Sequence, residues 1–148
     1  MTAQEAFTMM VKDEIAPALR ELGFKGSGQR FTLPSETHWA LLGLQKFTWS
    51  DRDRVDFTAN VTVVGRDVWE AQRAERPHLP ARPSANTYYG TYAWQTRIGA
   101  LAGRGEDAIW RVSPDRPTDR VAAEFVTAVR DHVLPAMRTR ITVAEPRL

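Results

Sequence analysis

The chain has 148 residues, no cysteine and a formal net charge of +2. This length suits one domain that buries about 70% of its unfolded surface, and the lack of cysteine excludes disulfides, thiol nucleophiles and cysteine-ligated zinc. Because neither a basic-then-apolar leader nor an apolar run of about 20 residues occurs, we expect a single domain over residues 1–148, in the cytoplasm and without membrane contact.

The first predicted element is a helix that ends at Gly23. Thr2 can cap its first turn, and Glu5 completes the spacing of a capping box. Apolar residues then recur at helical spacing and predict one buried stripe, and Gly23 can adopt the left-handed conformation that commonly follows a helix. Pro17 removes an amide inside this helix, so we expect a kink near Asp13.

Two long alternating segments follow a glycine-containing turn at 26–28 and a short strand at 29–33. In residues 37–49 both faces carry apolar side chains, which is typical of a central strand covered on both sides. Residues 54–64 alternate more cleanly, with one apolar and one polar face. The short connection at 50–53 predicts that the two strands form an antiparallel hairpin.

The second half of the chain predicts a short helix, a long loop, two strands and a final helix. The helix covers 67–75, and the loop at 76–90 holds three prolines and two tyrosines. A loop of this length inside a domain is typical of either a functional lid or a mobile insertion. Strands are expected at 91–98 and 108–112, and an amphipathic helix is expected from about Thr118.

The first and last helices share a sequence pattern. Residues 11–20 and 129–138 are alike at most positions, and each has a proline four residues after an aspartate. One hypothesis is that the two helices pack side by side as a quasi-equivalent pair, and chance similarity is the alternative. Together the elements predict an α+β domain with an antiparallel sheet of about five strands and the N- and C-terminal helices packed on one face.

Several short motifs follow one another in an order associated with one protein family. They are Gly23-Phe24-Lys25, Arg30-Phe31, Gln45, the stretch 57–61 (FTANV), the stretch 97–101 (RIGAL), Asp107 with Trp110, and Leu134-Pro135. On these motifs nearly the whole chain resembles the bacterial domain of unknown function 4304 family. The resemblance implies a fold but no established activity.

Residues with recognisable catalytic or metal-binding spacing are not found. His38, His78 and His132 are too far apart in sequence for a metal-ligand pair at i, i+4, and no nucleophile-elbow motif occurs. The acidic residues at 51–56 alternate with arginines, which is typical of a solvated loop rather than a calcium site. We therefore expect no metal and no cofactor, and we favour a non-enzymatic role.

The remaining candidates are polar residues that the sheet itself does not require. Gln45 interrupts an apolar face, Asn60 lies on the polar face of the next strand, and Lys46, Arg97 and Lys25 add positive charge nearby. The functional hypothesis is a pocket that holds an anionic or amide-bearing ligand, mainly through Lys46, Asn60 and Arg97.

The structural hypothesis is that these polar groups pair internally, as most buried polar groups do. In that case Gln45 bonds a neighbouring backbone group or the tyrosine-containing loop. Arg97 then pairs with Asp107 or with Asp56.

Three functions agree with this pattern. The first is a non-enzymatic binding or protein-interaction module, in which the exposed sheet face or an edge strand holds a protein partner or a second copy. The second is a small-ligand-binding protein or enzyme with a pocket between the sheet and the 76–90 loop. Nucleic-acid binding is the third, and we do not expect it because the basic residues are spread along the chain.

Overall fold

The computed structural model describes residues 1–144 and shows a six-stranded antiparallel sheet with helices on both of its faces. The strands are β1 (Lys25–Ser27), β2 (Arg30–Leu33), β3 (His38–Lys46), β4 (Val55–Gly65), β5 (Trp94–Arg97) and β6 (Trp110–Val112). The helices are α1 (Ala3–Met10), η1 (Val11–Ile15), α2 (Ala16–Glu21), α3 (Arg66–Glu75), α4 (Ile98–Leu101), α5 (Asp119–Ala128), η2 (Val129–Val133) and α6 (Leu134–Ala144), where η marks a π-helical segment. The predicted α+β class is confirmed.

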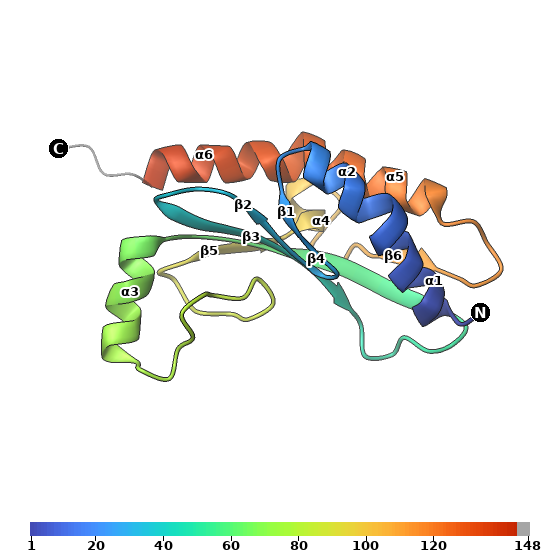
Figure 1. Ribbon diagram of the computed structural model, residues 1–148, viewed down its shortest axis with the longest axis horizontal. Coiled ribbons are helices and arrows are strands. Elements are labelled where there is room, and N and C mark those ends of the chain that lie inside the picture. The colour runs from blue at the N-terminus through green and yellow to red at the C-terminus, as the bar shows by residue number, and fades with distance from the viewer. Residues whose placement is uncertain (145–148) are drawn as a thin grey trace.

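The terminal helices cover one face of the sheet, as predicted, and α3 with the 76–90 loop lies on the opposite side (Figure 1). The strand order is β1-β2-β3-β4-β5, and β6 also pairs with β4. The long strand β4 is shared between two short partners, because its residues 60–63 pair with β5 and its residues 55–57 pair with β6. The predicted β3–β4 hairpin is confirmed.

The sixth strand, β1, lies where the sequence predicts only a turn. Lys25 pairs with Thr32, and Gly26 pairs with Phe31. Gly26 has a φ of 131°, and a Cβ atom there would lie 2.2 Å from the backbone oxygen of Arg30. Glycine is therefore required at this position, because it allows both the positive φ and the close approach of the two backbones.

The hydrophobic core lies between the sheet and the terminal helices. Alternate residues of β3 and β4 face these helices, since successive side chains of a strand point to opposite faces. They are fully or almost fully buried: Ala40, Leu42 and Leu44 from β3, and Val55, Phe57, Ala59, Val61 and Val63 from β4. Phe57 is the largest of them and contacts the rings of Phe7 and Phe125.

Both terminal helices contain a π-helical segment immediately before their proline region. The Ala16 amide donates to the Val11 carbonyl, and the Leu134 amide donates to the Val129 carbonyl. These i→i+5 bonds precede Pro17 and Pro135, so the irregularity expected near Asp13 takes the form of a π-helical turn. The predicted capping box of Thr2 and Glu5 is present.

The two terminal helices contact each other, so their predicted side-by-side packing is confirmed, and their quasi-equivalence stays a hypothesis. Segment η1 packs against α5, and the Thr118 hydroxyl donates a hydrogen bond to the Glu14 carboxylate. None of the helices among residues 1–144 is long and apolar enough to cross a membrane.

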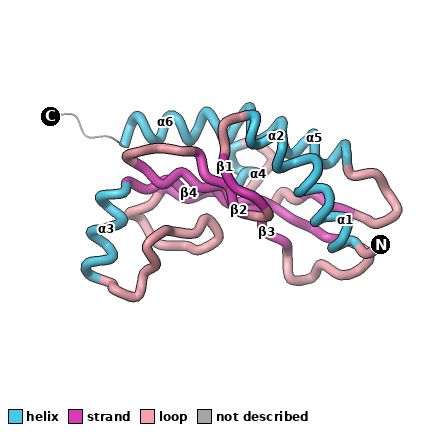
Figure 2. The backbone as a smooth tube through the Cα atoms, viewed as in Figure 1, coloured by secondary structure: helices cyan, strands magenta, loops and turns pink. Residues whose placement is uncertain are grey.

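The segment from α3 to α4 differs most from the predictions. Helix α3 begins one residue early, at Arg66, and β5 covers only the last part of the expected strand at 91–98. The short helix α4 was not predicted and follows β5 directly. The 76–90 loop turns back beneath the sheet (Figure 2), where buried Trp69 of α3 donates to the carbonyls of Pro80 and Ala81, each at 3.2 Å.

Candidate functional site

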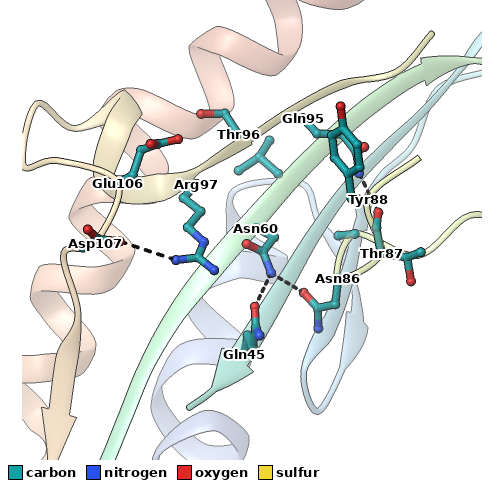
Figure 3. A pocket seen from close by; sticks show the side chains of 12 residues that line it. Gln45, Asn60, Asn86, Thr87, Tyr88, Gln95, Thr96, Arg97, Glu106 and Asp107 are labelled. Carbon is teal, nitrogen blue, oxygen red and sulfur yellow. Dashed lines mark hydrogen bonds and ion pairs between the residues drawn. The ribbon is translucent and has the colours of Figure 1, made fainter. Parts of the chain in front are cut away.

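A pocket of about 480 Å³ lies between the sheet and the 76–90 loop, on the face that the terminal helices do not cover (Figure 3). Strands β3, β4 and β5, the loop and the segment before β6 all contribute to its wall. Most of its lining is polar: the amides of Gln45, Asn60, Asn86 and Gln95, the hydroxyl-bearing Thr87, Tyr88 and Thr96, the guanidinium of Arg97, and the carboxylates of Glu106 and Asp107.

Three amide side chains form a connected row across one wall of this pocket. The Asn60 Nδ2 donates to Gln45 Oε1 at 2.7 Å and to Asn86 Oδ1 at 2.8 Å. The Asn86 Nδ2 donates to the Leu44 carbonyl at 3.3 Å. Among the described residues, Gln45 Nε2 and Asn60 Oδ1 have no protein partner, so the row offers one donor and one acceptor to a ligand.

Gly43 allows the loop to lie directly on the sheet. It pairs with Asn60 across the β3–β4 ladder, and a Cβ atom at this position would lie 2.6 Å from Asn86 Oδ1 and 3.1 Å from Ala85 Cβ. Both distances are shorter than ordinary van der Waals contacts. The absence of a side chain at Gly43 therefore brings Asn86 within hydrogen-bonding distance of Asn60.

Gln95 anchors the opposite end of the loop. Its Nε2 donates to the Thr87 carbonyl at 2.7 Å and to Thr62 Oγ1 at 3.1 Å, and its Oε1 accepts from the Tyr89 amide at 2.9 Å. The Gln95 amide therefore makes its hydrogen bonds within the protein. The loop is thus held against the sheet at both Asn86 and Gln95.

Arg97 supplies the positive charge of the pocket. It pairs with Asn60 in the β4–β5 ladder, so the two side chains are cross-strand neighbours on one face. Its Nη1 lies 4.0 Å from a carboxylate oxygen of Asp107, which is fully exposed. The predicted Arg97–Asp107 pair is confirmed, but an ion pair this long and solvated contributes little and leaves the guanidinium available to a ligand.

Asp56, the other carboxylate considered for Arg97, bonds different residues. It is 1% exposed, and it accepts hydrogen bonds from Arg111 Nε at 2.7 Å and from Trp49 Nε1 at 2.8 Å. The hydrogen bond from Arg111 is the main reason why the pKa of this carboxyl lies below its ordinary value. Asp56 therefore stays ionised and does not compete for Arg97.

The structure brings together three of the five predicted ligand residues. Gln45, Asn60 and Arg97 line the same pocket. Lys46 lies on the opposite, helix-covered face, where its Nζ is 5.6 Å from the centroid of the Phe7 ring. Lys25 belongs to β1 and lines a different hollow, so neither lysine contributes to this pocket.

Two neighbours of these residues were missed by the sequence predictions. Gln95 could have been found, because it lies two residues before Arg97 in a strand and therefore on the same face. Asn86 carried no local signal, since its place depends on contact with a strand 43 positions earlier in the chain. The predicted backbone or loop partner of Gln45 is also corrected, because Gln45 bonds the side chain of Asn60.

Comparison with known proteins identifies the family of the chain but no characterised relative. Searches of curated proteins and of solved structures give no match. One family model, described as Domain of unknown function (DUF4304), matches residues 15–139. This range includes all six strands and every residue of the pocket. The chain therefore belongs to the DUF4304 family.

Proposed function

We propose that this protein is a non-enzymatic binding module for a small polar ligand that carries an anionic group. The observation that carries the proposal is the arrangement of Gln45, Asn60 and Arg97 along one wall of the pocket. It offers an amide donor, an amide acceptor and a guanidinium to one bound molecule. Pockets with a few convergent polar groups of this kind are the usual places where small molecules bind.

The chemistry of the wall supports a ligand with a carboxylate or similar group beside an amide or hydroxyl group. A guanidinium presents N–H donors in a planar fork that matches a carboxylate. The free Gln45 Nε2 and Asn60 Oδ1 can then pair with the neighbouring polar group of the ligand.

A protein partner on the sheet is the less favoured form of the proposal. The 76–90 loop lies against the polar face of β4 at Asn60. The edge strands β1, β5 and β6 are only three or four residues long, whereas strand addition needs an extended edge. For an acid–base enzyme, the rim carboxylates Glu106 and Asp107 would be the candidate reacting groups. Both are exposed, so they lack the burial that usually tunes a catalytic carboxyl. The lack of cysteine supports placing this binding module in the bacterial cytoplasm.

Thermal unfolding with four probes tests the proposal. N-acetylglycine combines a carboxylate with an amide, and glucuronate combines a carboxylate with hydroxyls. N-acetylglycinamide and glucose are their uncharged counterparts. We expect at least one acid to raise the melting temperature in proportion to the logarithm of its concentration, because a ligand of the folded state stabilises it by RT ln(1 + [L]/Kd). Its uncharged counterpart should have a clearly smaller effect.

The Arg97→Gln variant distinguishes binding at this pocket from unspecific stabilisation of the protein by the acids. A hydrogen bond to a charged group contributes about 1.5–3 kcal/mol when desolvated. Because Arg97 is one-third exposed, we expect the low end of that range, or a roughly tenfold weaker affinity. Arg120→Gln is the matched control, since Arg120 also forms an ion pair with an exposed carboxylate, Glu124. Equal responses of the two variants, or no response to either acid, would contradict the proposal.

A further inference from the structure

A second hollow of about 700 Å³ lies at the other end of the same sheet face, near the start of β3. Its charged and polar lining consists of Lys25, Thr32, Ser35, Glu36, Arg66 and Arg82, around the ring of Trp39. It is separate from the pocket of Gln45, Asn60 and Arg97, with which it shares no lining residue.

Two guanidinium groups meet at the Trp39 ring. The Cζ of Arg66 lies 3.9 Å from the ring centroid, and the Cζ of Arg82 lies 5.1 Å from it. Arg66 is the first residue of α3, and Arg82 belongs to the 76–90 loop. Two different segments therefore bring positive charges to the same ring, where a bound anion would offset their mutual repulsion.

Among the described residues, no carboxylate forms an ion pair with the cations of this hollow. Neither Lys25, Arg66 nor Arg82 has a carboxylate oxygen within 4.0 Å, and the one acidic residue of the lining, Glu36, forms no ion pair with them. The three cations thus form an unbalanced positive site.

Arg66 is also held in position with part of its hydrogen-bonding capacity unused. Its Nη2 donates to the Ser35 carbonyl at 2.8 Å, and its backbone amide donates to the Thr37 carbonyl at 2.9 Å. Its Nε is buried and has no acceptor in the described part of the chain. Contact with the Trp39 ring accounts for the positions of both guanidinium groups. It does not account for the lysine in the same hollow or for the unpaired Arg66 Nε.

We propose that this hollow is a binding site for a phosphate group. A phosphate carries close to two negative charges at neutral pH and accepts several hydrogen bonds, which matches two guanidinium forks and an ammonium group better than a single carboxylate would. Arg66 is held in position by its hydrogen bonds and provides the first contact with the phosphate. The exposed side chains of Arg82, from the loop, and Lys25, from β1, provide the other contacts.

NMR titration of the Trp39 indole signal with inorganic phosphate, at constant ionic strength, tests the proposal. The signal is assigned from a Trp39→Phe variant. We expect a saturable shift in the unmodified protein and a roughly tenfold or greater loss of affinity in Arg82→Gln, since a charge-assisted hydrogen bond is lost. Because Arg82 is exposed, this variant should keep the melting temperature of the parent.

Arg140→Gln is the matched control, because Arg140 is also exposed and its Cζ lies 4.8 Å from the Trp94 ring. It should bind phosphate as the parent does. Glycerol 3-phosphate distinguishes the two sources of the group: tighter binding of the ester assigns an organic phosphate, and tighter binding of phosphate assigns the free ion. The proposal is overturned if phosphate gives no saturable shift, if Arg82→Gln binds as well as Arg140→Gln, or if acetate binds as tightly as phosphate.

Discussion

Replacing Phe57 by alanine is expected to lower the free energy of unfolding by about 3–5 kcal/mol, the range typical of a buried phenylalanine. Phe57 is fully buried on the helix-covered face of β4. Its ring centroid lies 5.1 Å from that of Phe7, 5.7 Å from that of Phe125 and 6.0 Å from that of Trp110. Removing this ring leaves a cavity between the sheet and both terminal helices.

Urea unfolding of the variant measures this loss as a lower midpoint at an unchanged slope. Phe47→Ala is the control, because Phe47 is only partly buried and stacks on the exposed Trp49, so its loss should be clearly smaller. If Phe57→Ala does not fold, Phe57→Leu should fold with a smaller loss of stability. A Phe57→Ala variant as stable as Phe47→Ala would contradict the burial of Phe57 between the sheet and the terminal helices.

Replacing Gly99 by alanine should destabilise the protein, although alanine normally favours a helix over glycine by about 1 kcal/mol. A Cβ atom at Gly99 would lie 2.1 Å from the Gly105 carbonyl oxygen and 2.9 Å from Ala108 Cβ. The first of these groups is backbone and cannot rotate away. We therefore expect the clash to outweigh the helix preference and to cost about 1–3 kcal/mol in total.

The same substitution should also affect the pocket. Gly99 follows Arg97 closely in sequence, and the segment that it contacts carries Glu106 and Asp107 of the pocket rim. Urea unfolding measures the stability. Gly65→Ala serves as the control, because a Cβ there would meet only the Val68 side chain at 3.6 Å. A Gly99→Ala variant as stable as the parent would contradict the tight contact between α4 and this segment.

The alternation of residues 54–64 was sufficient to predict which side chains of β4 face the core. Residues 37–49 carry apolar side chains on both faces, so their alternation alone did not predict which face of β3 the terminal helices cover. The same alternation already separates Lys46 from Gln45, since adjacent residues of a strand point to opposite faces. Grouping Lys46 with Asn60 and Arg97 was therefore an error that the sequence itself could have corrected.

The similarity between the two terminal helices was equally informative. The shared spacing of aspartate and proline corresponds to two π-helical segments at matching positions, and these helices contact each other. What the sequence could not distinguish was a kink from a π-helical turn, because that outcome depends on which carbonyl the amides before each proline can reach.

Contacts between distant segments account for most of what the sequence missed. Strand β1 contains Gly26, which has a positive φ, and Gly28 follows it in the turn. This composition is typical of loops, and the strand exists because it pairs with β2. The position of the 76–90 loop depends on two residues outside it. Gly43 precedes the loop by more than 30 residues, and Gln95 follows it in β5. Local patterns do not encode such contacts, so the pocket wall formed by Asn86 could not be predicted.

The most direct test of the proposed binding function is an NMR titration of the side-chain amide signals of Gln45 and Asn60 with N-acetylglycine and glucuronate. We predict that at least one acid shifts both signals saturably, because these amides line the pocket beside Arg97. The side-chain signals of Gln4 and Gln72, which do not line the pocket, should remain in place. If both acids leave Gln45 and Asn60 unshifted, or shift all four amides alike, the polar wall of this pocket is not a binding site for such ligands.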